Sequence, residues 1–504
     1  MIDLQKRGRW LVDGGWKALP PSDFRLPTWA TAATLAVALA GCTLGPAYER
    51  PAAELPATWV DQPAQGVKAP ATRWWTLYGD PALEKLVDEA LVSNQDLALA
   101  VARVDEARAR ARGVDSLQWP AVDATFQRDR TRNSDRSSFP LPPNALENNN
   151  YRGQLNVAYE VDLWGRLSSA SKAARSDMLA TEAARETVRI TLLTEVARAY
   201  FNLVAFDAQL AATRRSLALR SEGLDLQKVR HEAGLINDFV LRQLEAEVNA
   251  ARAQLPALEA QRTAQELALA VLLGRSPRAI MEGAVARRTD QGEPQAPVVP
   301  EGLPSDLLLR RPDVAQAEQG LIAANARISE ARAALFPRIG LSGYYGSEST
   351  ALGDLFTGPA RIWQLAFGLA QPIFQGGRLF AEVDAVKARE RQAVAQYQKT
   401  LQEAFREVRQ ALNTQVKARE AYDAESARTV ALSEATRLAR VRYVNGLISQ
   451  LEVIDADRNL LQAELNRSDA LRIQRAAVAD LVKALGGGWT GFEPAPVAQT
   501  SKPN

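Results

Sequence analysis

The sequence predicts a mainly α-helical protein with a small β part, in which long antiparallel helices are joined to four β-strands and the arrangement is duplicated. Three observations predict this class. Short sequences recur at a constant spacing of 212 positions, two long stretches without proline keep helical apolar spacing, and four segments alternate apolar and polar residues. Together they indicate two copies of one helix-and-strand unit.

The first 41 residues have the pattern of a signal peptide. Arg25 precedes an apolar run at positions 28–40, which is too short for a spanning helix, and the run ends in LAGC at positions 39–42. This ending resembles a bacterial lipobox, in which the cysteine is acylated and becomes the mature N-terminus. Cys42 is the single cysteine of the chain. We predict its lipidation, and because Thr43 follows rather than aspartate, sorting to the outer membrane; the alternative is a chance buried cysteine.

Internal repeats define the predicted organisation of the rest of the chain. Three landmarks recur 212 positions apart: Gly165-Arg166-Leu167 with Gly377-Arg378-Leu379, Gly234-Leu235-Ile236 with Gly446-Leu447-Ile448, and Leu273-Gly274 with Leu485-Gly486. We assign the first repeat to residues 81–274 and the second to residues 305–486. The lipidated extended segment 42–80 and the proline-rich linker 275–304 are expected to form an equatorial belt, and residues 487–504 a C-terminal tail.

Each repeat is predicted to contain one helix, two strands and a long helical hairpin. Positions 168–233 and 380–445 lack proline, and a helix of that length measures about 100 Å. This is longer than compact domains usually hold, so it indicates coiled-coil packing. Return helices are expected at 237–273 and 449–485. Helices at 81–117 and 305–335 supply the remaining length.

The four predicted strands alternate between an apolar and a polar face. The strand at 151–161 places Leu155 and Val157 on one side and Gln154 and Asn156 on the other, and positions 363–369 repeat the pattern. The first strands of the repeats are expected at 121–127 and 339–345. A half-buried soluble hairpin is the ordinary interpretation. If the strands cross a membrane, four of them cannot close a barrel, whereas a homotrimer supplies twelve and leaves a pore.

Composition excludes several functional classes. No apolar stretch is long enough for an inner-membrane transporter, and 61 basic against 59 acidic residues give no global field for nucleic acid. We find no hydrolase, ATPase or cofactor motif, so no enzyme activity, cofactor or metal is expected. His231 is the single histidine and is interpreted as surface. The glycine-rich positions 486–491 match a dinucleotide fingerprint only in spacing, because no strand precedes them.

Three segments resemble a known family. CTLGPAYERPAAELPATW at 42–59, WWTLYGDPALEKLVDEAL at 74–91 and DLLLRRPDVAQAEQGLIAANARI at 306–328 are similar to the NodT/OprM branch of the TolC superfamily. These are outer-membrane efflux lipoproteins of resistance-nodulation-division pumps. The resemblance implies a homotrimer with a twelve-stranded transmembrane β-barrel, a lipid anchor in the outer membrane and a large periplasmic α-helical barrel.

The resemblance also implies a passive duct, which a periplasmic membrane-fusion adaptor and an inner-membrane pump open at its periplasmic helix tips. Carried over to this chain, the adaptor contacts are Gly234, Leu235, Gly446 and Leu447. Glycine at these turns also has a structural reason, because a left-handed helix end costs it nothing.

The periplasmic gate implied by the resemblance consists of Tyr443, Glu452 and Asp455. Tyr443 would latch neighbouring coils, and the two carboxylates would ring the closed entrance. Ile448 stands where one branch of the superfamily has a latch arginine. Val240 and Gln243 occupy the positions of the first repeat that match Glu452 and Asp455. The arginine latch of that branch is therefore not expected here. The alternative interpretation of Glu452 is solvated helix surface.

Other functional classes remain open from sequence alone. An ABC-driven type I secretion channel would use a similar outer-membrane component. A structural coiled-coil envelope lipoprotein would not need four alternating strands. The exported substrate is not encoded in any motif, because selectivity is expected to reside in the pump.

Overall fold

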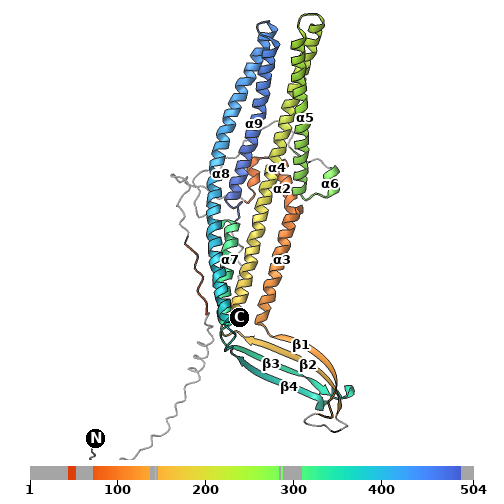
Figure 1. Cartoon of the computed structure of the whole chain (residues 1–504), viewed down its shortest axis with the longest axis vertical. Coiled ribbons are helices and arrows are strands. Elements are labelled where there is room, and N and C mark those ends of the chain that lie inside the picture. The colour runs from red at the N-terminus through yellow and green to blue at the C-terminus, as the bar shows by residue number, and fades with distance from the viewer. Residues whose placement is uncertain are drawn as a thin grey trace, which may run out of the picture.

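The computed structural model describes residues 44–52, 72–136, 142, 146–282, 285–287 and 309–489. Four long helices dominate it: α4 (Arg166–Glu232), α5 (Asp238–Leu272), α8 (Arg378–Val444) and α9 (Gln450–Ala484). α4 packs on α5 and α8 packs on α9, so that two hairpins project toward one end of the molecule, while the strands lie at the other end (Figure 1). α4 and α8 each contain 67 residues, and α5 and α9 each contain 35. The predicted duplication is therefore present in the helices.

The helix predicted at 81–117 is two helices, α2 (Pro81–Ser93) and α3 (Gln95–Asp115). Asn94 separates them in an extended conformation, where its side chain caps α3 by accepting from the Leu97 N–H and donates Nδ2 to the Leu272 carbonyl at 2.9 Å. Gly274 passes so close that an added Cβ would lie 1.9 Å from the Ser93 carbonyl oxygen. The break thus serves a contact between distant segments.

The helix predicted at 305–335 is shorter, α7 (Pro312–Ala333), and positions 305–308 lie outside the described residues. Pro312 fits the first turn because it lacks the N–H that a helix start leaves unpaired. Arg311 before it is extended, as the proline ring requires. Within the predicted linker, a short helix α6 (Pro277–Glu282) was not anticipated.

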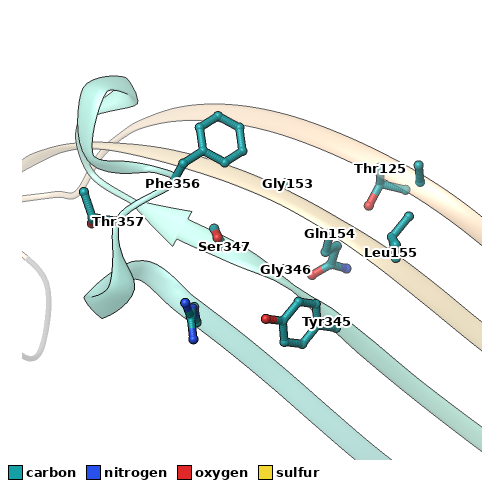
Figure 2. Close-up of a pocket in the computed structure, with 11 residues that line it drawn as sticks. Thr125, Gly153, Gln154, Leu155, Tyr345, Gly346, Ser347, Phe356 and Thr357 are labelled. Atoms are coloured by element: carbon teal, nitrogen blue, oxygen red, sulfur yellow. The ribbon is translucent and has the colours of Figure 1, made fainter.

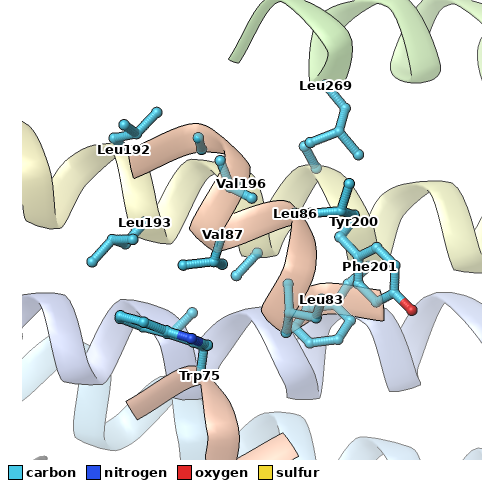
Figure 3. Packing of buried hydrophobic residues seen from close by; sticks show 14 of the residues in the cluster. Trp75, Leu83, Leu86, Val87, Leu192, Leu193, Val196, Tyr200, Phe201 and Leu269 are labelled. Carbon is cyan, nitrogen blue, oxygen red and sulfur yellow. The ribbon is translucent and has the colours of Figure 1, made fainter. Parts of the chain in front are cut away.

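The central core surrounds two neighbouring tryptophans, Trp74 and Trp75. The short helix η1 (Trp74–Tyr78) places Trp74 and Trp75 at 1% and 2% exposure among side chains of α2, α4, α5 and α9. Figure 3 shows Trp75 facing Leu193 of α4 in this cluster. Fully burying an apolar side chain of this size contributes about 1.5–3 kcal/mol. The cluster therefore joins the hairpins of the two repeats midway along the molecule.

The sheet contains β1 (Ala121–Arg132), β2 (Glu147–Val161), β3 (Arg338–Ser349) and β4 (Arg361–Ala370), antiparallel in the order β1-β2-β3-β4. The first strand of each repeat extends beyond its predicted bounds by five residues, all at the end of β1, and one at the start and four at the end of β3. β2 and β3 pair across the repeats, from Val161 opposite Ile339 to Tyr151 opposite Ser349. β1 and β4 are the two edges, and each has one edge without a partner strand in the described chain.

Candidate functional site

One face of the sheet is apolar and exposed. The strand period places large apolar side chains of all four strands on this face, and none is buried. They are Val122, Phe126, Leu155, Val157, Leu341, Trp363, Leu365, Phe367 and Leu369. Exposed fractions reach 83% at Leu365. A contiguous apolar surface of this extent indicates an apolar environment rather than water.

The opposite face is polar and hydrogen-bonded within itself. Asn156 donates Nδ2 to Thr125 Oγ1 at 3.1 Å, and Gln154 donates Nε2 to Asn156 Oδ1 at 2.6 Å. At the end of the sheet farthest from the helices, the β3–β4 connection borders a hollow of about 340 Å³, which Phe356, Gly153 and Tyr345 help to line (Figure 2). An apolar face, a polar face and two free edges are the properties of a wall segment in a membrane barrel.

The helix tips at the other end are closely similar in the two repeats. Gly234 and Gly446 both have φ of 71°, and the Leu235 and Leu447 N–H groups bond the Arg230 and Arg442 carbonyls at 2.8 and 2.9 Å. A left-handed glycine followed by this bond ends a helix without steric cost.

Both tip leucines are exposed by 67%. The four residues predicted to contact an adaptor therefore occupy equivalent turns and present an apolar side chain at each tip.

Tyr443 bridges the two hairpins. Its hydroxyl accepts hydrogen bonds from Gln227 Nε2 at 2.6 Å and from Arg230 Nη1 at 3.0 Å, both on α4. Gln227 is 1% exposed, so its amide has no competing water. The sequence singled out Tyr443 but not its partners, because they lie more than 200 positions away. α8 is thus linked to α4 about one turn before the tips.

Glu452 and Asp455 lie exposed in the first turns of α9, and each has a local partner. Glu452 accepts the Ser449 N–H at 3.2 Å and completes a capping box with that residue. Asp455 accepts from Arg458 at 2.5 Å and from Asn459 at 3.3 Å. The alternative interpretation of Glu452 as helix surface thus has a structural basis, since the carboxylate stabilises the helix start.

Asp457 is a site residue that the sequence did not single out. It is 7% exposed and accepts hydrogen bonds from Ser216 Oγ at 2.8 Å and Arg220 Nε at 3.0 Å, while Arg440 lies at 3.5 Å. Arg220 also lies 3.4 Å from Glu247. One buried carboxylate therefore joins α4, α8 and α9, and α5 joins through Arg220. The signal in the sequence was an acid within the apolar series 453, 457, 461, whose steps of four mark one helix face.

The N-terminal segment 44–52 lies along α7. Arg50 binds Glu318 through two bonds of 2.6 and 2.9 Å, and the Leu44 carbonyl accepts from Arg332 at 3.2 Å. Arg332 is in the last turn of α7, just before β3 begins at Arg338. Leu44 is therefore next to the junction between helices and sheet. Cys42 lies outside the described residues.

A family model for outer membrane efflux proteins matches residues 86–275 and 303–487. The chain belongs to this family. It is 36% identical over 461 residues to the solvent efflux pump outer membrane protein SrpC of Pseudomonas putida, which covers 90% of this chain and 96% of the relative. Identity is 32% to the cation efflux system protein CusC of Escherichia coli K12, over 90% and 98% of the two chains.

A solved channel of this family has the same fold. The open state of the MtrE outer membrane channel of Neisseria gonorrhoeae superposes with a TM-score of 0.79 at 31% identity, covering 89% of this chain and 99% of that chain. The predicted class, long antiparallel helices joined to an outer-membrane sheet in a duplicated chain, is confirmed. This outer membrane efflux protein is accordingly an outer-membrane channel with a large helical part in the periplasm.

Among the described residues, the efflux protein has no helix that is both long and apolar enough to cross a membrane.

Proposed function

We propose that three copies of this chain close a twelve-stranded barrel and form a passive exit duct for a tripartite efflux pump. The observation that carries the proposal is the four-stranded sheet with one apolar face, one polar face and unpartnered edges at β1 and β4. Open edges are not tolerated in lipid, so β4 of one copy must pair with β1 of the next. Eight strands from a dimer would be nearly filled by side chains, whereas twelve leave a pore.

Native mass spectrometry of the mature protein in detergent tests the stoichiometry, and planar bilayers test the pore. We expect a trimer mass and stepwise conductance. A stable monomer or dimer that conducts would refute the closure argument.

The exposed tip leucines support docking of a periplasmic adaptor. Leu235 and Leu447 are equivalent, two-thirds exposed, and held by identical glycine turns. Changing both to serine should weaken binding of the cognate adaptor while leaving the trimer intact. A matched change of Leu219 and Leu438 to serine, exposed leucines farther from the tips, should have little effect. Equal binding by both variants would refute the assignment.

The Tyr443 contacts support a gate at the tips. Its two hydrogen bonds hold α8 on α4, and a bond to a charged donor contributes about 1.5–3 kcal/mol. Separating the hairpins would break both bonds in each chain. Adaptor and pump would supply the free energy that opens the entrance, and the channel itself would need neither nucleotide nor catalyst.

A lipid anchor at Cys42 is supported by the position of Leu44 beside the junction of helices and sheet. Cys42 precedes Leu44 by two positions. Acyl chains on Cys42 would therefore be close to a membrane whose boundary lies at the junction of helices and sheet. The relatives are named for solvent and cation efflux, which favours a tripartite pump over the type I secretion alternative. Because relatives of similar identity export such different cargo, we propose that the partner pump selects the substrate.

A further inference from the structure

Three arginines follow one another on the apolar face of β1, at the end of the strand farthest from the helices. Arg128, Arg130 and Arg132 occur at every second position, so they share the face that carries Val122 and Phe126. All three side chains are exposed. The same face of one strand therefore changes from apolar to strongly basic within two residues.

This basic end carries little compensating charge. Glu147 is the single carboxylate on this face of the four described strands, and it lies 2.8 Å from Arg130 and 3.8 Å from Arg132. Arg128 lies 5.5 Å over the ring of Tyr151, the residue opposite it on β2. One carboxylate is thus shared by two of the three guanidinium groups.

A further arginine lies at the corresponding end of β4. Arg361 pairs with Ser347 of β3, whose row continues through Gly153 to Phe126 on β1. It also lines the hollow of about 340 Å³, together with Tyr345 and Phe356 (Figure 2). A guanidinium group that shares an open hollow with two aromatic residues suits an amphiphile with an anionic head.

The two edges of the sheet bring these groups together when chains close into a ring. β1 and β4 are the edge strands. At the end of the sheet farthest from the helices, β4 begins with Arg361 and β1 ends with the three arginines. Where β4 of one copy pairs with β1 of the next, Arg361 and the arginines at 128, 130 and 132 flank the same seam. The basic cluster is complete only between two copies.

We propose that each seam binds the phosphate-bearing headgroup of a lipid in the outer leaflet, with its acyl chains on the apolar rows below. This inference rests on the proposed barrel. An arginine on a lipid-facing strand is costly at the bilayer midplane and tolerated near the interface, so these arginines mark the headgroup level. Guanidinium groups bind phosphate in a bidentate manner. The positive charge of the arginines that Glu147 does not neutralise also attracts an anionic headgroup. The apolar row with Trp363 and Leu365 begins directly beside Arg361.

The test uses the delipidated mature protein and native mass spectrometry. The probes are a bisphosphorylated lipid A, the same lipid with both phosphates removed, phosphatidylglycerol and inorganic phosphate. We expect up to three molecules of the bisphosphorylated lipid per trimer, with affinity at least tenfold above that of the dephosphorylated lipid. Phosphatidylglycerol should bind more weakly, since it offers one phosphate, and inorganic phosphate should not compete at millimolar concentration because it has no acyl chains.

The variant R128Q/R130Q/R132Q/R361Q should lose at least tenfold in affinity for the bisphosphorylated lipid and nothing for the dephosphorylated lipid. Lysine at the four positions should restore most of the binding. The matched control R110Q/R214Q/R278Q/R437Q removes four exposed arginines from the helices. If the glutamine variant fails to assemble, the inference is judged on the wild type alone, by whether it binds the bisphosphorylated lipid more tightly than the dephosphorylated lipid.

Equal binding of the phosphorylated and dephosphorylated lipids, or equal loss in the control variant, would overturn the inference. Trimer mass and conductance are recorded on the same samples. If both are normal while lipid binding ignores phosphate, the inference fails and the proposed channel stands. If neither trimer nor conductance is found, the proposed function itself fails.

Discussion

Replacing Asp457 by alanine removes the anionic partner at the centre of the contact between α4 and α9. Its carboxylate is 10% exposed, and the Arg220 side chain that it binds is 7% exposed. After the change, the one carboxylate that Arg220 still contacts among the described residues is Glu247, at 3.4 Å. Breaking a buried ion pair by removing one partner costs about 3–5 kcal/mol, since the remaining charge stays buried. We expect the contact between the two hairpins within each chain to weaken by about this amount.

Hydrogen exchange measures this weakening locally. A loss of about 3 kcal/mol in the local opening free energy accelerates exchange roughly 100-fold. The acceleration should be centred on positions 453–461 of α9 and reach the facing turn of α4 at 216–220. Exchange near positions 476–482 of α9 should be nearly unchanged because this part of the helix is packed in the central core. Single-channel conductance in planar bilayers should rise if this contact between the hairpins helps to close the periplasmic entrance.

The control lies two turns farther along the same helix pair. Glu464 is 3.3 Å from Arg215, but the two side chains are 30% and 61% exposed. Such partly exposed pairs contribute about 0–1 kcal/mol. Glu464→Ala should therefore change exchange by less than about fivefold. If both variants exchange alike, the buried carboxylate does not hold the hairpins together, and the reasoning is refuted.

Three further predictions concern the sequence-derived sites. Cys42→Ser should abolish incorporation of labelled palmitate, and unchanged labelling would contradict the lipidation site. Tyr443→Phe should raise conductance, because the ring remains while the acceptor for two hydrogen bonds on α4 is lost; wild-type conductance would mean that these bonds do not close the entrance. The variant E452Q/D455N removes both charges, and glutamine preserves the capping box. It should reduce inhibition by multivalent cations from the periplasmic side, whereas alanine at positions 240 and 243 should not; equal inhibition in wild type and E452Q/D455N would leave the carboxylates with a structural role only.

The sequence by itself determined the elements whose signals are local and repeated. Long apolar patterns, free of proline in α4 and α8, predicted the hairpins to within a few residues, and alternation predicted the strands and their faces. The glycine turns followed from a constant offset and the left-handed conformation that helix ends favour. Each of these features depends on residues close together in the chain.

Only the tertiary structure decided features that depend on distant partners. The break at Asn94 exists because its amide bonds the Leu272 carbonyl, 178 positions away. Tyr443 meets donors on α4 across 213 and 216 positions, and Asp457 is buried because Ser216 lies opposite, 241 positions away. Periodicity shows which face of a helix is buried but not which helix covers it. The partner of a polar group on that face is therefore fixed by packing between the repeats, and this packing converts an apparently ordinary acid into the buried link between the hairpins.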